Sequence, residues 1–430
     1  MERLLHYVWA HKLYDAPSLI TVDGIPVEVL DPGIRNTDAG PDFFNAKIKA
    51  GGMVWAGNVE IHDKASDWMR HHHDIDKAYD SVILHVTGKN DAMICQTNGT
   101  PIPQLVLTVP EPVRKNIDWL LLRDDAIPCR HFIGEIDPLH LTFWTGALLC
   151  ERMERKTADI AALLEQQEND WNEVFYIVLT RNFGFGVNSN AFEQLARSLP
   201  FRCIQKQRNS YSQVEALLFG QAGMLDEAGD CAYYRLLQRE YRFLQHKFGL
   251  KPLDASLFKG LRVRPGNFPH QRLAQLAAIW TAHDTLFSKV LEAATPGQLK
   301  SCFRVLPSDY WKTHFHFRHA SPEKEKPIGE DTLNGLLINT VAPMLFAYGQ
   351  RNGQPECSER ALRLLERLPA EKNNIVATFS RAGFDVRNAG DSQALIQLKR
   401  AYCETKKCLY CRIGFRLLSF PYFLCETCRA

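Results

Sequence analysis

Two carboxylates and one histidine have the spacing needed to hold a divalent cation beside a reacting water molecule. Asp42 opens a run of alternating polar and apolar residues, and Glu60 ends the next such run. His62 follows two residues after Glu60, so on a strand their side chains point to the same face. Carboxylate oxygens suit hard cations such as Mg²⁺ or Mn²⁺. Such an ion lowers the pKa of a bound water, and His62 would orient that water for phosphodiester hydrolysis.

A structural interpretation of the same carboxylates stays open. Asp42 follows Pro41, and aspartate beside proline is common in turns that hold no ligand. Glu60 is equally compatible with the solvated end of a strand. Spacing alone therefore gives two interpretations of this pair.

The elements that must position these groups are a hairpin and its neighbours in the first part of the chain. Residues 43–49 alternate as a half-buried strand does, and Gly51-Gly52 is a turn signal. The full set of expected elements is a helix over 2–14, strands over 26–30, 43–49 and 53–61, a helix over 63–79 that Ser66 would cap, a strand over 81–87 and a further strand over 105–109. The order is α-β-β-β-α-β, and the hairpin brings both carboxylates to one sheet edge.

This order, with proline-aspartate followed by a Glu-x-basic triplet, resembles the PD-(D/E)XK nuclease superfamily. The resemblance implies a restriction-endonuclease-like core in which Asp42 and Glu60 hold Mg²⁺. It places His62 where the family has a lysine that assists the nucleophile, and Glu2 where a carboxylate of the first helix often joins the site. Histidine is largely neutral at pH 7, so His62 is a poor copy of an ammonium group.

The histidines after the hairpin indicate a different metal chemistry. His71 and His73 lie on the segment predicted to be helical, each within one turn of an aspartate, and His85 lies on the strand over 81–87. Together with His62 they could bind a transition metal such as Zn²⁺, Mn²⁺ or Fe²⁺. An exposed helix face without ligands, or one that contacts phosphate, is the alternative for this run.

The C-terminal cysteines have the spacing of metal ligands. Cys403-x4-Cys408-x2-Cys411 supplies three thiols, and Cys425-x2-Cys428 supplies further ligands thirteen residues later. Four-cysteine zinc coordination is the first hypothesis for this tail. An iron–sulfur cluster and buried thiols without a ligand are the alternatives.

Two arginine-bearing stretches in the later part of the chain are candidates for contact with nucleic acid. The first holds Arg181 among glycines and aromatic residues, and the second holds Arg262, Arg264, Asn267 and Arg272. Arginine with interleaved aromatic residues suits phosphate and base contacts. The second stretch is equally compatible with a rigid loop between helices.

Composition bounds the class of protein. The chain has 430 residues, of which 45% are hydrophobic, and 51 basic residues against 49 acidic ones. A net charge of +2 excludes a polybasic protein, so any binding of DNA or RNA needs a local patch. No apolar run approaches the roughly 20 residues of a membrane span, so no membrane association is expected. Without a visible signal peptide the cytoplasm is the expected location, and scattered cysteines such as Cys129 are expected only to pack.

The motifs together also resemble an uncharacterised bacterial family known as a domain of unknown function, which supplies no activity. They are DAGPDF, VEIH, SDWMRHHHDIDKAY, VILHV, RPGNFP, DSQALIQLK and CETKKCLYC. That family pattern ends near CLYC, so Cys425 and Cys428 lie beyond it.

The sequence therefore predicts an α+β nuclease-like domain over 1–135, a larger all-α domain over 136–400 and a cysteine-rich metal-binding tail over 401–430. The predicted function is divalent-metal-dependent phosphodiester hydrolysis. Two alternatives remain: a catalytically inactive adaptor that binds nucleic acid or protein, and a transition-metal hydrolase of a small substrate. The pattern distinguishes neither DNA from RNA nor one oligomeric state from another.

Overall fold

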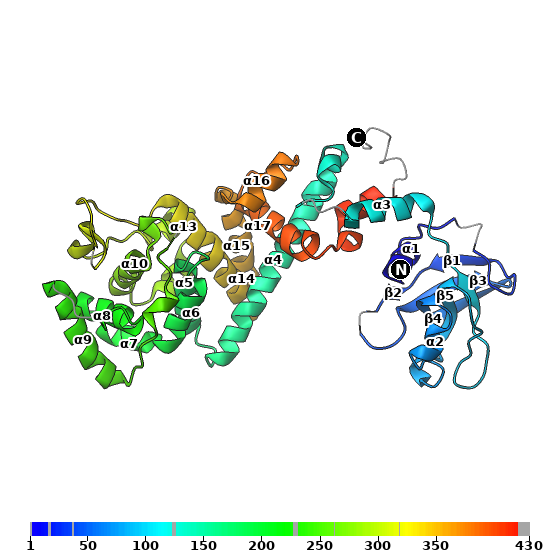
Figure 1. Ribbon diagram of the computed structural model, residues 1–430, viewed down its shortest axis with the longest axis horizontal. Coiled ribbons are helices and arrows are strands. Elements are labelled where there is room, and N and C mark those ends of the chain that lie inside the picture. Colours follow the sequence, from blue (N-terminus) through cyan, green and yellow to red (C-terminus); the bar gives the residue numbers. More distant parts are fainter. Residues whose placement is uncertain are drawn as a thin grey trace. The chain divides into compact units, whose positions relative to one another are not determined.

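The computed structural model divides the chain into two compact units (Figure 1). It describes residues 2–15, 19–36, 38–122, 126–226, 231–261, 263–317 and 319–419. The first unit comprises the described residues of Met1–Leu141, Ala382–Phe384 and Leu398–Ala430, and the second comprises those of Thr142–Arg381 and Asp385–Gln397. The first unit carries a sheet and the second is mainly helical, which confirms the predicted fold class. The described part of the predicted tail is grouped with the first unit.

A mixed sheet is the centre of the first unit. β1 and β4 flank β3 and are antiparallel to it, whereas β5 runs parallel to β4 and β6 parallel to β5. The strands are β1 (Val27–Asp31), β2 (Ile34–Arg35), β3 (Phe43–Ala50), β4 (Met53–Lys64), β5 (Val82–Lys89) and β6 (Gln104–Val106), with β2 paired to β3 outside the main order. The predicted hairpin is confirmed: Gly51 and Gly52 have φ of +57° and +79° between β3 and β4, a conformation open to glycine.

The helix that opens the chain is shorter than the periodicity suggested. α1 (Glu2–Ala10) packs against β4 and β5 and buries one residue after another from Leu4 to Trp9. It ends because Lys12 adopts a left-handed φ of +51°. The Lys12 ammonium then donates to the carbonyls of Val29 and Leu30 at 2.8 and 2.9 Å, which ties this end to β1.

The prediction of a helix over 63–79 was wrong. α2 (Asp67–Arg70) is a single turn, and a 3₁₀ turn follows only at Lys77–Tyr79. The Ser66 hydroxyl donates to Asp91 at 3.1 Å and does not cap α2. His72 then takes a left-handed φ of +64°, which a continuing helix does not allow. The histidine run therefore forms an irregular turn and not a helix face.

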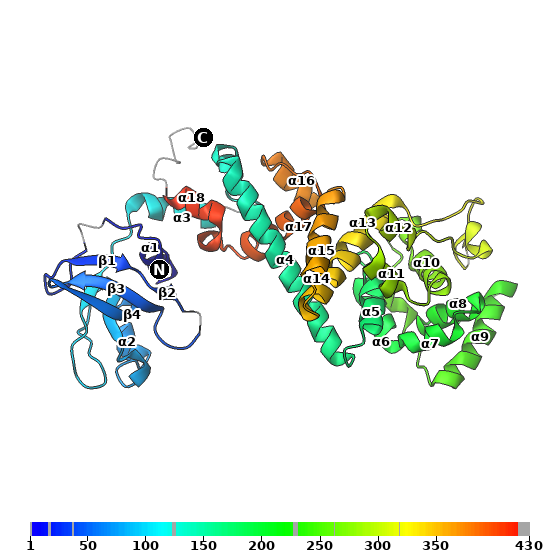
Figure 2. The same ribbon diagram turned by 180° about the vertical axis from the view of Figure 1, so that it is seen from behind.

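The C-terminal segment of the first unit packs on its N-terminal elements. α18 (Arg412–Ser419) lies beside α3 (Glu111–Leu122) in both views (Figures 1 and 2). The Asn116 side chain donates to the Leu417 carbonyl at 3.1 Å, and Phe415 packs against the ring of His11 with centroids 4.7 Å apart. Residues about three hundred positions apart thus share one core.

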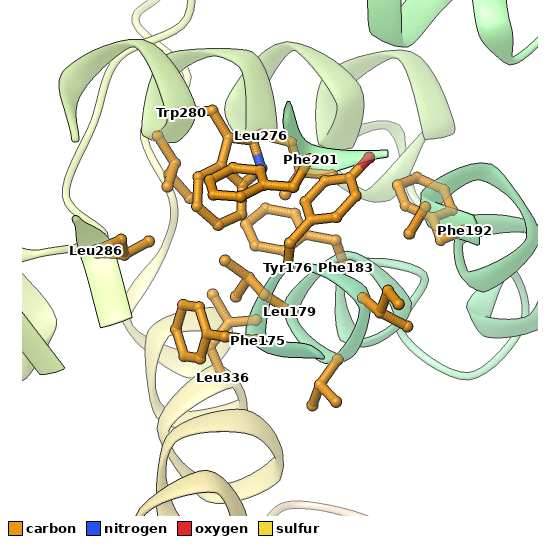
Figure 3. Close-up of a cluster of buried hydrophobic side chains, with 14 of the residues drawn as sticks. Phe175, Tyr176, Leu179, Phe183, Phe192, Phe201, Leu276, Trp280, Leu286 and Leu336 are labelled. Carbon is orange, nitrogen blue, oxygen red and sulfur yellow. The ribbon is translucent and has the colours of Figure 1, made fainter. Parts of the chain in front are cut away.

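The second unit is a set of helices around an aromatic core. In Figure 3, Tyr176, Phe201 and Trp280 lie together at its centre. Phe201 stacks on Tyr176 at 5.2 Å and meets Trp280 edge-on at 4.7 Å. The helices are α4 (Pro138–Gln166, which begins in the first unit), α5 (Trp171–Phe183), α6 (Ser189–Ser198), α7 (Phe201–Gln207), α8 (Tyr211–Gln221), α9 (Ala232–Phe248), α10 (Pro269–Ala282), α11 (Leu286–Glu292), α12 (Pro296–Ser301), α13 (Glu330–Leu336), α14 (Ala342–Arg351), α15 (Pro355–Arg367), α16 (Asn374–Arg381) and α17 (Ala389–Gln397), with short strands β7 (His314–His316) and β8 (His319–Ala320). Among the described helices, none is long and apolar enough to cross a membrane.

A carboxyl group is buried inside this helical core. Glu215 on α8 accepts hydrogen bonds from the Tyr233 phenol, the Ser308 hydroxyl and the Trp311 indole. Burial raises the pKa of Glu215 to about 7, because these donors offset only part of the cost of a charge in a dry interior.

We expect Glu215→Gln to stabilise the protein more at pH 8 than at pH 5. The wild-type carboxyl has its ordinary pKa of 4.5 when unfolded and about 7 when folded, so its favourable contribution is complete below pH 4.5 and is lost as the pH rises through 7. The amide does not titrate, so its relative advantage should grow by about 2 kcal/mol between these pH values. Urea unfolding of both proteins measures it, and an equal difference at both pH values would contradict the burial argument.

Candidate metal centre

Three neighbouring strands bring polar residues side by side across the sheet. β3 and β4 pair through Phe43 and Val59, which sets Asp42 beside Glu60. On the other edge of β4, Glu60 pairs with His85 of β5. Residues that pair across strands project to the same face, so this register gathers the predicted site residues.

Backbone amides hold both carboxylates of the hairpin. The Asp42 N–H donates to Glu60 Oε2 at 3.0 Å, and the Ile61 N–H donates to Asp42 Oδ2 at 3.0 Å. The same Asp42 oxygen lies 3.2 Å from His6 Nε2 on α1. Asp42 Oδ2 is therefore engaged by the backbone and by α1, whereas Glu60 Oε1 lies toward the histidines.

The histidines gather around the second Glu60 oxygen. Glu60 Oε1 lies 3.4 Å from His62 Nε2 and 3.4 Å from His73 Nε2. His71 Nδ1 lies 3.1 Å from His62 Nε2. One ring nitrogen from each of His62, His71 and His73 lies within 4.8 Å of the other two. Three imidazoles thus converge on one point, with the Glu60 carboxylate beside two of them. Glu60, His62, His71 and His73 are called the histidine centre below.

Aromatic packing fixes the orientation of the rings. Trp68, fully buried on α2, meets His73 and His85 edge-on with centroids 5.4 and 5.3 Å apart. Tyr79 stacks on His73 at 3.7 Å with an interplanar angle of 24°. Glu60, His62 and His73 are buried, whereas His71 is exposed, so solvent reaches the histidine centre at His71.

Burial keeps His62 neutral. It lowers the pKa of His62 to about 3, and the neighbouring His85, His73 and His71 contribute in the same direction. Burial likewise raises the pKa of Glu60, against the hydrogen bond from His73, which lowers it. A metal ligand must be a neutral imidazole, so His62 is already in the state that coordination requires.

His85 supports His62 from behind. His85 Nε2 lies 2.8 Å from His62 Nδ1. With Nε2 directed at a cation, His62 keeps its proton on Nδ1 and donates it to His85, the second contact typical of metal-binding histidines. His85, which was predicted to be a ligand, is thus suited to orient one.

The donor set favours a transition metal. Three converging imidazole nitrogens fit Zn²⁺, Mn²⁺ or Fe²⁺ better than Mg²⁺, which prefers oxygen and keeps several waters. Of the two metal hypotheses drawn from the sequence, the geometry therefore favours the transition metal.

Comparison with known proteins gives one match. Residues 2–374 match the family described as Protein of unknown function (DUF2851). The chain belongs to this family. No curated protein and no solved structure matches it. The expected membership in an uncharacterised family is confirmed, and the function of this DUF2851 chain must be argued from its residues.

Sequence reasoning missed two neighbours of the histidine centre, His6 and Tyr79. The first helix contributes His6 beside Asp42, where the resemblance to nucleases had suggested Glu2. Burial alone would lower the pKa of His6, but the hydrogen bond and charge of Asp42 outweigh it and raise the pKa. The available signal for His6 was its place among the apolar residues of the first helix, which is buried on nearly every side.

The predicted nucleic-acid contacts lie in the second unit. Arg264 and Asn267 are exposed, and Arg181 is partly buried with its guanidinium 3.8 Å from Glu193. Arg272 is buried, and its guanidinium donates to Asn267 and Gln275, an arrangement that serves packing. Arg262 lies outside the described residues. Contact with nucleic acid through Arg181, Arg264 and Asn267 stays a prediction.

Three of the predicted tail cysteines lie in described parts of the first unit. Cys403 ends a π-helical segment (Leu398–Cys403), and Cys408 and Cys411 flank a 3₁₀ turn (Cys408–Tyr410). Cys425 and Cys428 lie outside the described residues.

We expect His71→Asn to weaken Co²⁺ or Mn²⁺ binding about tenfold or more, because it removes one of the three converging imidazole donors. His71 is exposed, so the change spares the core. His72→Asn is the matched control: it is the next residue of the same turn, and asparagine tolerates its positive φ. Visible absorption of Co²⁺ and Mn²⁺ paramagnetic resonance measure binding. Equal affinities of the two variants would exclude His71 as a ligand.

Proposed function

We propose that this protein is a metal-dependent hydrolase whose catalytic centre is Glu60, His62, His71 and His73. The observation that carries the proposal is the convergence of three imidazole nitrogens within 4.8 Å, with Glu60 Oε1 3.4 Å from two of them. Trp68, Tyr79 and His85 contact the histidine rings and hold this arrangement in place. A divalent ion held there would supply Lewis-acid chemistry and activate a water at neutral pH.

The remaining residues suit proton transfer and charge control. Glu60, the carboxylate of the centre, has a raised pKa and is suited to accept a proton from the reacting water. His6, whose pKa Asp42 raises, would supply positive charge beside the Asp42 carboxylate. The positive charge of His6 would take the place of the lysine charge that the nuclease superfamily has at the position of His62.

Phosphodiesters are the substrate class that we propose. The support is the order of elements, an antiparallel hairpin followed by a parallel strand with a carboxylate on each hairpin strand, which is similar to the nuclease superfamily. A metal centre that activates a water molecule would also suit attack on a phosphorus atom. A small phosphoester is the second candidate, and it is favoured by burial of Glu60, His62 and His73 behind one exposed histidine.

The test is hydrolysis of labelled single- and double-stranded DNA and RNA, and of a small chromogenic phosphodiester, with Zn²⁺, Mn²⁺ or Mg²⁺. We expect turnover with Mn²⁺ or Zn²⁺ to exceed that with Mg²⁺. Cleavage of the small substrate alone would select the second candidate. Absence of turnover with every substrate and metal would contradict the hydrolase.

We expect Glu60→Gln to lower kcat about 100-fold or more, because it removes the general base. The fold should survive, since burial disfavours the wild-type charge and the amide oxygen still accepts the Asp42 N–H. Glu28→Gln, an exposed position of β1 in the same sheet, is the matched control and should leave kcat unchanged. Equal rates for the two variants would remove Glu60 from the mechanism.

A further inference from the structure

A fourth cysteine follows a loop that contacts the C-terminal segment in which the other three described cysteines lie. Cys129 precedes a 3₁₀ helix (Arg130–Glu135), far from Cys403, Cys408 and Cys411 in the sequence. All four belong to the first unit. The sequence motif had suggested Cys425 or Cys428 as the remaining ligand, because spacing along the chain cannot reveal Cys129.

Contacts of the backbone bring the two segments together. The Lys399 ammonium donates to the Ala126 carbonyl at 2.7 Å, which sets the π-helical segment that ends at Cys403 against the loop that leads to Cys129. α3, the helix before that loop, packs against both α18 and the 3₁₀ turn at Cys408–Tyr410. The loop with Cys129 therefore joins the segment with the other three cysteines.

The described cysteines shift one another's pKa in the same direction. Burial raises the pKa of Cys129 well above its ordinary value, and Cys411, Cys403 and Cys408 raise it further. Burial raises the pKa of Cys403 to about 12, with further contributions from Cys411 and Cys408.

The C-x2-C segment is folded tightly. The Cys411 N–H donates to the Cys408 carbonyl at 3.2 Å. A Cβ at Gly414 would lie 2.0 Å from the same carbonyl oxygen, so position 414 requires glycine. A closed turn with a cysteine at each end is the usual source of two adjacent ligands in structural zinc sites.

We propose that Cys129, Cys403, Cys408 and Cys411 form a four-cysteine zinc site that fastens the C-terminal segment to the N-terminal part of the first unit. Zinc takes four thiolates directly at about 2.3 Å and needs no inorganic sulfide. Loading draws the sulfurs to about 3.8 Å from one another, the edge of that tetrahedron. The site is closed and structural, and it is independent of the hydrolase proposed above.

The experiment compares Cys129→Ser with Cys95→Ser in the full chain, both in the first unit. Co²⁺ is added after removal of bound metal, and thiolate charge-transfer absorption counts the sulfur ligands separately from the histidine centre. We expect four thiolates in the wild type and in Cys95→Ser. Cys129→Ser should bind about 100-fold more weakly, and metal analysis of the purified wild type should find zinc.

Two further variants keep the test decisive if Cys129→Ser fails to fold. Cys129→His should retain the metal with three thiolates, because imidazole is also a zinc ligand, and a merely packed cysteine would show no such rescue. The double variant Cys425→Ser/Cys428→Ser should keep the wild-type spectrum. Full absorption in Cys129→Ser, loss of absorption in the double variant, or iron with sulfide in the purified protein would each overturn the proposal.

Discussion

In β3, β4 and β5 the backbone register decides which side chains meet. Phe43 pairs with Val59 and Glu60 with His85, and this pairing alone sets Asp42, Glu60 and His85 in one row. Side chains alternate along a strand with a period of two, so a slip of one residue would turn Glu60 and His62 to the opposite face. The two-glycine turn fixes the length of the hairpin and therefore protects the register.

Backbone amides and aromatic rings keep the buried polar cluster of the histidine centre in order. Backbone amides of Asp42 and Ile61 each bind a carboxylate from the opposite strand, so neither carboxylate is left unpaired in the interior. The rings of Trp68 and Tyr79 limit the rotation of His73 and His85. A buried polar cluster destabilises an apolar core unless its groups are paired. Here the paired groups are held rigidly, so a ligand would meet donors that are already oriented.

Local pattern was sufficient for β1, β3, β4 and β5 and for the helical character of the second unit, because alternation and helical periodicity are set by neighbours in the sequence. It also marked Asp42, Glu60, His62, His71, His73 and His85 as candidate site residues, since residue type and proximity to the hairpin singled them out. It failed over 63–79, where the His72 backbone and the Ser66 contact with Asp91 override helical composition. It missed the positions of His6 and Cys129, because contacts between distant segments leave no mark in local spacing.

The hydrogen bond between Asn116 and Leu417 has a consequence for the order of folding. The partners are 301 residues apart, and the whole helical unit is synthesised between them. Domains generally fold in order as the chain emerges from the ribosome. The N-terminal sheet must therefore wait, with the surface that receives α18 uncovered, until the helices of the second unit have been made. Contacts between residues so far apart in the sequence slow folding. Until α18 docks, the surface that receives it is exposed and prone to aggregation, and a chaperone would act there.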